Sequence, residues 1–371
     1  KIKNKLFPFY KKKEVKELFK IINKGEPKDQ KNAMFVGGCV RKYLSNDEID
    51  DIDIATSLTP DQLKEKFNEA NIKSFDTGLE HGSITVIVDK IKFEITTLRK
   101  DIKTDGRHAE IEFTDSWKDD SDRRDFTINA IYLDQNGKLF DPQNGAQNLK
   151  QKKINFIGDP QKRIEEDYLR ILRFIRFSIQ YRDFNKEDQT LKVIQKNLNG
   201  IVKISKERIF SELSKIIILE NISDIFSDKK ELYQIFKVIF PEFKYIERIK
   251  KVNQDDYKKF IKFEKNLLLA LFLIDDTDNH IYFAHKYKIS NHLKEYLNFI
   301  HTHYKLAQKN KNFFVKDLKK NTFYHGKEKM KSLAKFHFLC SSKIKYETID
   351  DVLEKITSIN IPEFPITGKY L

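Results

Sequence analysis

Two aspartates separated by a single residue are the first side chains in this sequence that suggest chemistry. Asp51 and Asp53 lie in the run DDIDIAT, and Ile52 and Ile54 occupy the alternate positions. Alternate residues of a β-strand face the same side, so we expect both carboxylates on one face and both isoleucines in the core. Adjacent carboxylates repel each other unless a cation lies between them, and Mg²⁺ prefers such oxygen ligands. The pair is therefore a candidate metal site, although an isolated Asp-x-Asp is also typical of a solvated strand end.

A pair of glycines precedes the aspartates. Gly37 and Gly38 follow the apolar run AMFV and precede CVRKYL, which has the pattern of a helix. Glycines at such a turn let backbone N–H groups approach a phosphate, and the helix dipole favours its negative charge. Arg41 falls in the first turn of this helix, where its guanidinium is placed to bind a triphosphate. Two glycines alone also fit an ordinary tight turn, but the order strand, glycine pair, helix and Asp-x-Asp favours a nucleotide-binding site.

Two later segments combine charged side chains with apolar anchors. Segment 122–131 reads DRRDFTINAI, a mixture of arginines, aspartates and an amide that is hard to explain as ordinary surface. The alternative is a helix start capped by Asp125. In segment 165–177, EEDYLRILRFIRF, Asp167 and Arg170 lie one helical turn apart, which by itself predicts only an i,i+3 ion pair.

In their order and spacing, these motifs resemble the class II tRNA nucleotidyltransferase and bacterial poly(A) polymerase family, within the DNA polymerase beta superfamily. The resemblance covers about residues 30–220 and includes SKERIFSELSKI (205–216), in which Ser205 is expected to cap a helix. It implies a third carboxylate on a neighbouring strand, for which Glu94 in FEITTLR is the candidate. One residue departs from the family pattern, since Lys42 stands where relatives usually carry an acid. That position is peripheral to the metals, so we expect only a local change.

The resemblance implies a two-metal nucleotidyl transfer. Asp51, Asp53 and Glu94 would be the catalytic carboxylates, and Asp51 and Asp53 would hold two Mg²⁺ ions. One ion would activate the 3′-hydroxyl of the RNA, and the other would stabilise the leaving pyrophosphate. Positioning and charge stabilisation would supply most of the catalysis.

The resemblance also implies that an aspartate and an arginine select the incoming base. Cytosine and adenine both present an amino donor beside a ring-nitrogen acceptor, so Asp167 would accept from the amino group and Arg170 would donate to the ring nitrogen. Uracil and guanine reverse this pattern and would be rejected. Asp125 and Asn129 would contact the ribose, and the arginines would contact phosphates or order the site. The implied nucleotide-binding residues are Gly37, Gly38, Arg41, Arg123, Arg124, Asp125, Asn129, Asp167, Arg170, Arg173 and Arg176.

These implications predict an enzyme that adds CCA to tRNA 3′ ends from CTP and ATP. The segment DGRH (105–108), which relatives use in switching from C to A addition, argues against an enzyme limited to CC. A poly(A) polymerase or an A-adding enzyme is the alternative within the family, although TSLTPDQLKEKF after the aspartates is closer to the tRNA enzymes. An inactive RNA-binding protein is the alternative from another class. The three carboxylates and the Asp167/Arg170 pair argue against it.

The elements that position these residues form a mixed pattern followed by helices. Up to about residue 135, β-branched runs alternate with a helical stretch at 60–70, and the turn-rich DQNGKLFDPQNG (134–145) ends this part. Beyond it, apolar spacing predicts helices over 163–180, 206–220, 229–240, 264–274 and 292–307. We therefore predict an α+β fold with a mixed α/β nucleotidyltransferase head at 1–148, an all-α neck at 149–218 and an all-α body and tail at 219–371.

Charge is distributed unevenly along the chain, whose net charge is +14. Residues 51–150 carry 14 basic and 20 acidic side chains, whereas residues 151–371 carry 43 and 29. An acidic region suits divalent metals and a basic region suits a polyanion, although a lysine-rich composition also raises basic charge without any ligand. Residues 301–350 hold 12 basic and 4 acidic side chains with interleaved Tyr and Phe, so we expect this tail to bind the tRNA acceptor and T arm through phosphates.

Cysteine usage and hydropathy bear on the compartment. Cys39 and Cys340 are far apart and form neither a disulfide framework nor a Cys-rich zinc site. No apolar run is long enough to span a bilayer, and the basic opening lacks the apolar region of a signal peptide. The sequence therefore predicts a reduced, cytoplasmic location without a membrane partner.

Overall fold

The chain folds as two compact units, Lys1–Ile204 and Ser205–Leu371. The computed structural model describes residues 8–27, 31–78, 82–104, 109–182, 188–222, 224–227, 230–251, 264–340 and 346–361. The boundary between the units lies inside the segment 149–218 that the sequence assigns to a neck. The division into head, neck and body therefore stays a prediction.

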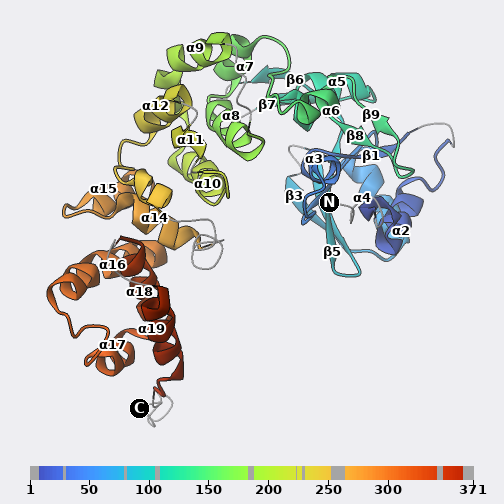
Figure 1. Cartoon of the computed structure of the whole chain (residues 1–371). Coiled ribbons are helices and arrows are strands. Elements are labelled where there is room, and N and C mark those ends of the chain that lie inside the picture. The colour runs from blue at the N-terminus through green and yellow to red at the C-terminus, as the bar shows by residue number, and fades with distance from the viewer. Residues whose placement is uncertain are drawn as a thin grey trace. The chain divides into compact units, whose positions relative to one another are not determined.

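The first unit contains every described strand and begins and ends with helices (Figure 1). Its elements in chain order are η1 (Phe9–Lys11), α2 (Lys13–Ile22), β1 (Ala33–Val36), α3 (Gly38–Ser45), β2 (Ile52–Thr56), α4 (Pro60–Glu69), β3 (Ser74–Gly78), β4 (Ser83–Val88), β5 (Ile91–Thr97), β6 (Arg99–Thr104), β7 (Ala109–Phe113), α5 (Trp117–Asp122), η3 (Thr127–Asn129), β8 (Tyr132–Leu133), β9 (Leu139–Phe140), α6 (Gly145–Lys150), α7 (Pro160–Glu166), α8 (Leu169–Gln180), α9 (Asp188–Lys196) and η4 (Leu198–Lys203). The predicted α+β fold is confirmed.

The sheet of the first unit has seven strands in the order β3-β4-β5-β2-β1-β8-β9. Strands β2 and β5 pair in parallel and all other neighbours are antiparallel, while β6 and β7 form a separate hairpin. The strands expected from β-branched runs are β1, β2, β4 and β5. The turn-rich segment 134–145 is the connection of the short hairpin β8–β9 and the start of α6.

A buried cluster in the centre of this sheet fixes the strands that carry the candidate site. Met34 and Val36 of β1, Ala55 of β2 and Tyr132 of β8 pack together with Leu98, and the partly buried Trp117 and Phe140 cover them. Buried apolar side chains on adjacent strands stabilise their register, because a slip by one residue would expose all of them. The strands that precede and follow the glycine pair are therefore held firmly.

The predicted helix over 163–180 is wrong as a single element. Helix α7 ends at Glu166 and α8 begins at Leu169, with Asp167 in extended backbone (φ −154°, ψ 104°) between them. The Asp167 carboxylate accepts a hydrogen bond from the backbone N–H of Leu169 (3.1 Å). A short acidic side chain that bonds the backbone locally competes with helix continuation, which explains the break. Apolar side chains are buried on both sides of the break, since Ile164 and Leu172 are fully buried.

The second unit consists of helices, and the described residues after Phe140 form no strand. Its elements are α10 (Lys206–Ile217), α11 (Asp224–Ser227), α12 (Lys230–Ile239), η5 (Ile246–Lys251), α14 (Lys265–Leu273), α15 (Asn279–Lys286), α16 (Asn291–Lys309), α17 (Leu318–His325), α18 (Lys327–Cys340) and α19 (Tyr346–Ser358). As expected, the Ser205 hydroxyl caps α10 by accepting from the Arg208 N–H. Every residue from Leu267 to Leu273 is buried, so α14 is a central helix of this unit. Among the described helices, none combines the length and apolarity needed to cross a bilayer.

Candidate active site

The parallel pairing of β2 and β5 brings two predicted carboxylates together. Asp53 is the direct register partner of Glu94. On either side of this pair, Ile52 and Ile54 are buried in β2, so the two acids lie on the opposite face of the sheet. Asp51 immediately precedes β2 and is exposed. The structure thus places all three acids at one site, while their catalytic roles stay predictions.

The three carboxylates give this site an excess of negative charge. Burial, together with the charges of Glu94 and Asp51, raises the pKa of Asp53 to about 6, and Arg41 and Arg124 offset only part of this rise. Such a shift measures how strongly the protein disfavours the ionised form until a cation is present. The donor set therefore fits a divalent cation.

The described residues contain no preassembled group of three His, Cys, Asp or Glu side chains that could hold a metal ion. Mg²⁺ commonly takes one or two protein carboxylates and completes its coordination with substrate phosphates and water. Asp51 and Asp53 match that kind of site. Water and a nucleoside triphosphate would then supply the remaining oxygen ligands.

The glycine turn lies directly against β2. Gly37 has φ 72° and ψ −125°, a backbone conformation that residues other than glycine rarely adopt. A Cβ atom at Gly37 would lie 3.6 Å from Oδ2 of Asp53, and one at Gly38 would lie 3.8 Å from it. The buried Cys39 thiol donates to the backbone carbonyls of Val36 (3.3 Å) and Asp53 (3.5 Å), which fastens the turn to β2. No side chain caps α3, so its first N–H groups can bind an anion beside the carboxylates.

Arg41 extends from α3 toward the later motifs. Its guanidinium donates to Oδ1 of Asn129 and to the hydroxyl of Tyr181 (3.2 Å), and it lies 4.9 Å from the Phe177 ring centre. The neighbouring Lys42, which departs from the family pattern, forms an ion pair with Asp50. The positive charge of Lys42 is therefore neutralised locally by Asp50, next to Asp51.

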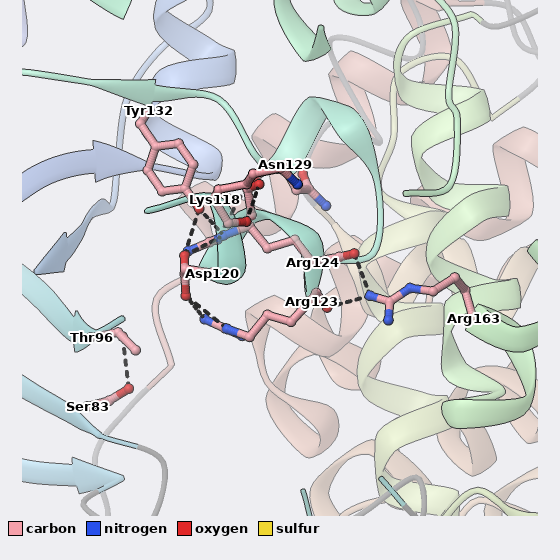
Figure 2. Close-up of polar contacts among 10 residues, drawn as sticks. Ser83, Thr96, Lys118, Asp120, Arg123, Arg124, Asn129, Tyr132 and Arg163 are labelled. Atoms are coloured by element: carbon pink, nitrogen blue, oxygen red, sulfur yellow. Dashed lines mark hydrogen bonds and ion pairs between the residues drawn. The ribbon is translucent and has the colours of Figure 1, made fainter. Parts of the chain in front are cut away.

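The paired arginines of segment 122–131 share one buried acid, Asp120, which sequence reasoning missed. The Asp120 carboxylate accepts from Arg123 (2.6 Å), from Arg124 (2.8 Å) and from the hydroxyl of Tyr132 (2.7 Å), as Figure 2 shows. Burial alone would raise the pKa of Asp120, but the charges of Arg124 and Arg123 hold it well below its usual range. The available signal was an acid three and four residues before the two arginines, on the short helix α5.

Asp125 and Asn129 form a second chain of contacts. Asp125 accepts from the Asn129 amide (2.6 Å) and from Nε of Arg173 (2.6 Å). Burial would raise the pKa of Asp125, but the charge of Arg173 and the hydrogen bond from Asn129 lower it well below the ordinary value. Because Asn129 also accepts from Arg41, the chain Arg41–Asn129–Asp125–Arg173 connects α3 with α8.

The helices after the sheet contribute the remaining predicted residues. Arg163 of α7 donates to the backbone carbonyls of Arg123 and Arg124 (2.6 Å for the latter), as seen in Figure 2. Arg170 is buried and donates to Glu166 (2.6 Å) and to the carbonyl of Arg163 (2.8 Å). The Arg176 guanidinium lies 4.1 Å from the Phe177 ring centre. The segment 105–108, predicted as a lever, lies outside the described residues.

A sheet that places three acids beside a glycine turn, backed by an arginine-rich helix, defines a nucleotidyltransferase head. Residues 33–155 match the family model described as "Poly A polymerase head domain", and residues 183–246 match "Probable RNA and SrmB- binding site of polymerase A". The chain is 35% identical over 358 residues to the mouse mitochondrial CCA tRNA nucleotidyltransferase 1, a match that covers 92% of this chain and 78% of that protein. The chain belongs to the class II tRNA nucleotidyltransferase and poly(A) polymerase family.

Other relatives match over shorter stretches. The human mitochondrial CCA tRNA nucleotidyltransferase 1 is 45% identical over 201 residues, which cover 53% of this chain and 46% of that protein. The CCA-adding enzyme of Lactobacillus helveticus is 39% identical over 222 residues, or 55% and 54% of the two chains. The crystal structure of the Bacillus stearothermophilus CCA-adding enzyme in complex with CTP shares the fold, with a TM-score of 0.69 and 24% identity over 93% of this chain and 82% of that one.

Proposed function

We propose that this enzyme adds CCA to the 3′ ends of tRNA, using CTP and ATP and releasing pyrophosphate. The observation that carries this proposal is the register of β2 and β5, which sets Glu94 beside Asp53 at the glycine turn. The relatives named above as CCA tRNA nucleotidyltransferases and CCA-adding enzymes support the substrate. We propose a cytoplasmic location, although the mouse and human relatives are mitochondrial.

Asp51 and Asp53 would hold two Mg²⁺ ions together with the nucleotide phosphates. When bound at these residues, the metal ions would supply the charge that activates the attacking 3′-hydroxyl and stabilises the leaving pyrophosphate. Glu94, beside Asp53, keeps the site acidic. Arg41 and the N–H groups of α3 bind the triphosphate, which orients it toward the aspartates.

The segments 122–131 and 165–177 would hold the nucleoside. Asp125 and Asn129 contact the ribose, and Arg123, Arg124, Arg173 and Arg176 contact phosphates or order the site. Asp167 and Arg170 select cytosine and adenine through their common donor and acceptor pattern. Arg170 bonds Glu166 in the structure, so base binding includes an exchange of that partner.

The decisive experiment uses three transcripts of one tRNA, ending at the discriminator base, at C and at CC. Each is incubated with CTP, ATP, UTP or GTP alone and with CTP and ATP together, and product lengths are measured. We expect three added nucleotides on the shortest transcript with CTP and ATP together, and no addition from UTP or GTP. A long ladder of A residues would support a poly(A) polymerase instead. Addition of A only to the CC transcript would support an A-adding enzyme.

The basic helices of the second unit would bind the tRNA acceptor and T arm through phosphates. Contacts between lysines and phosphates release counterions, so tRNA affinity should fall steeply with added salt. With six or more such contacts, we expect about a 10³-fold loss between 50 and 200 mM salt. The measurement is a series of binding titrations with the full chain, and an affinity that does not change with salt would contradict phosphate binding.

A further inference from the structure

The outward face of helix α17 (Leu318–His325) carries two aromatic side chains that nothing in the proposed reaction uses. The side chains of Phe323 and Tyr324 are exposed to 51% and 68%. Their ring centres lie 5.6 Å apart with an angle of 78° between the planes. Exposing two adjacent aromatic rings costs hydrophobic free energy, so adjacent exposed rings are a candidate contact surface.

The spacing of α17 separates a buried face from an exposed one. Leu318 and Thr322 are buried where α17 packs on α18 and α19. Lys319 and Lys320 lie one turn before Phe323 and Tyr324, and all four side chains are exposed. Because residues four apart share a helix face, each lysine stands next to an aromatic ring. The exposed side of α17 thus consists of two lysines and two aromatic rings.

The positive charge of this face indicates which kind of partner it binds. Neither Lys319 nor Lys320 forms an ion pair with a described residue. The first turn of α17 holds no acid, and the N-cap residue Asp317 accepts a hydrogen bond from the Asn310 amide (2.9 Å). Lysine is depleted at protein interfaces, whereas exposed aromatics beside basic side chains are typical of surfaces that bind single-stranded nucleic acid.

We propose that this face stacks unpaired nucleobases of the RNA substrate, with Lys319 and Lys320 at the flanking phosphates. Rings set at 78° do not sandwich one base, so each ring offers its own face. A duplex presents only phosphates and base edges along its length, so the occupants are bases of a loop. The proposal rests on the proposed function in taking tRNA as the substrate.

The test compares the affinity of full-length variants for a tRNA transcript that ends at the discriminator base. The double variant Phe323→Ala/Tyr324→Ala should bind about fivefold or more weakly, with an unchanged salt dependence because no charge is removed. Phe323→Leu/Tyr324→Leu should be equally weak, since leucine has no ring to stack. Lys319→Ala/Lys320→Ala should instead reduce the slope of log affinity against log salt by about 1.4–1.8.

Two controls keep the outcome interpretable. Tyr282→Ala removes another tyrosine of the same unit, 61% exposed on α15, and should bind as the wild type does. A 12-base-pair RNA duplex with a 3′ CC overhang and no loop should bind the wild type and the double alanine variant equally. Equal melting temperatures verify that the variants fold, since the replaced side chains are exposed.

Unchanged tRNA binding by the alanine variant would overturn the proposal, and so would wild-type binding by the leucine variant, which would point to a protein-like apolar contact. These binding comparisons do not require catalysis. If the wild type adds no nucleotides, the proposed function fails while the outcome for α17 is still decided.

Discussion

The variant Asp53→Asn is expected to lose roughly 10³-fold or more of the nucleotide incorporation rate. The amide keeps the size of the side chain but removes the negative charge that would hold a cation against the triphosphate. Binding of tRNA should be unchanged, because Asp53 lies on the sheet of the first unit and the basic helices lie in the second. Incorporation is measured in single-turnover assays with saturating tRNA, and affinity is measured by titration.

The same substitution should not destabilise the protein in the absence of divalent metal. The pKa of Asp53 is raised because its charge is partly buried and repelled by Glu94 and Asp51, so removing that charge relieves repulsion. We expect the melting temperature in EDTA to be equal to or above that of the wild type. Added Mn²⁺ should raise the melting temperature of the wild type and not that of the variant.

Asp50→Asn is the matched control for this variant. Asp50 is an exposed acid in the same run, three residues before Asp53, and pairs with Lys42. Its substitution should leave incorporation near the wild-type rate, since exposed ion pairs contribute little. A retained rate in Asp53→Asn, or an equal loss in Asp50→Asn, would contradict the assignment of the metal site.

The strand β2, which carries Asp53, could be predicted because its information is local. Alternation of Asp51, Ile52, Asp53 and Ile54 specifies a strand with one buried face, and the structure buries both isoleucines. The position of Glu94 followed from the family resemblance, and the parallel register of β2 and β5 places it next to Asp53. The strands β8 and β9, two residues each, could not be predicted, because so short a run has no pattern of its own and is defined only by its pairing.

The break at Asp167 and the partners of the arginines could not be predicted for a different reason. Periodicity continues through residues 163–180, so the sequence favours one helix. The interruption is seen only in the structure, in the extended backbone of Asp167 and in the hydrogen bond from the Leu169 N–H to its side chain. Likewise, Arg170 has carboxylates three and four residues before it, and spacing does not decide which one it contacts. The structure gives Glu166 as one partner of Arg170.

The variant Asp120→Asn is expected to destabilise the first unit strongly. Asp120 is buried, and its carboxylate neutralises Arg123 and Arg124, whose side chains are only 15% and 16% exposed. Removing one partner of a buried ion pair leaves uncompensated charge and costs about 3 kcal/mol or more. For a unit of this size, the melting temperature should fall by about 6–12 °C, which calorimetry measures.

The pH dependence of this loss follows from the depressed pKa of Asp120. A group whose pKa is lower in the folded state stabilises the fold above its unfolded value, about 3.9, and loses that contribution as the pH falls through the folded value. The difference in stability between wild type and variant should therefore be largest at neutral pH and narrow below pH about 4. A difference that does not change with pH would show that lost packing, rather than lost charge, explains the destabilisation.

Asp120 should also affect catalysis, because it positions Arg124 and does not itself contact the substrate. The charge of Arg124 reaches Asp53 and lowers its pKa, so displacing Arg124 from Asp120 alters the electric field at the candidate metal site. We expect kcat to fall about 10–100-fold with the KM for tRNA unchanged, as for other residues that orient a metal site from behind. Asp122→Asn is the matched control on the same helix, since Asp122 pairs with the exposed Lys118 and should change neither stability nor kcat. If Asp122→Asn had the same effect as Asp120→Asn, integrity of α5 rather than the buried ion cluster would explain both.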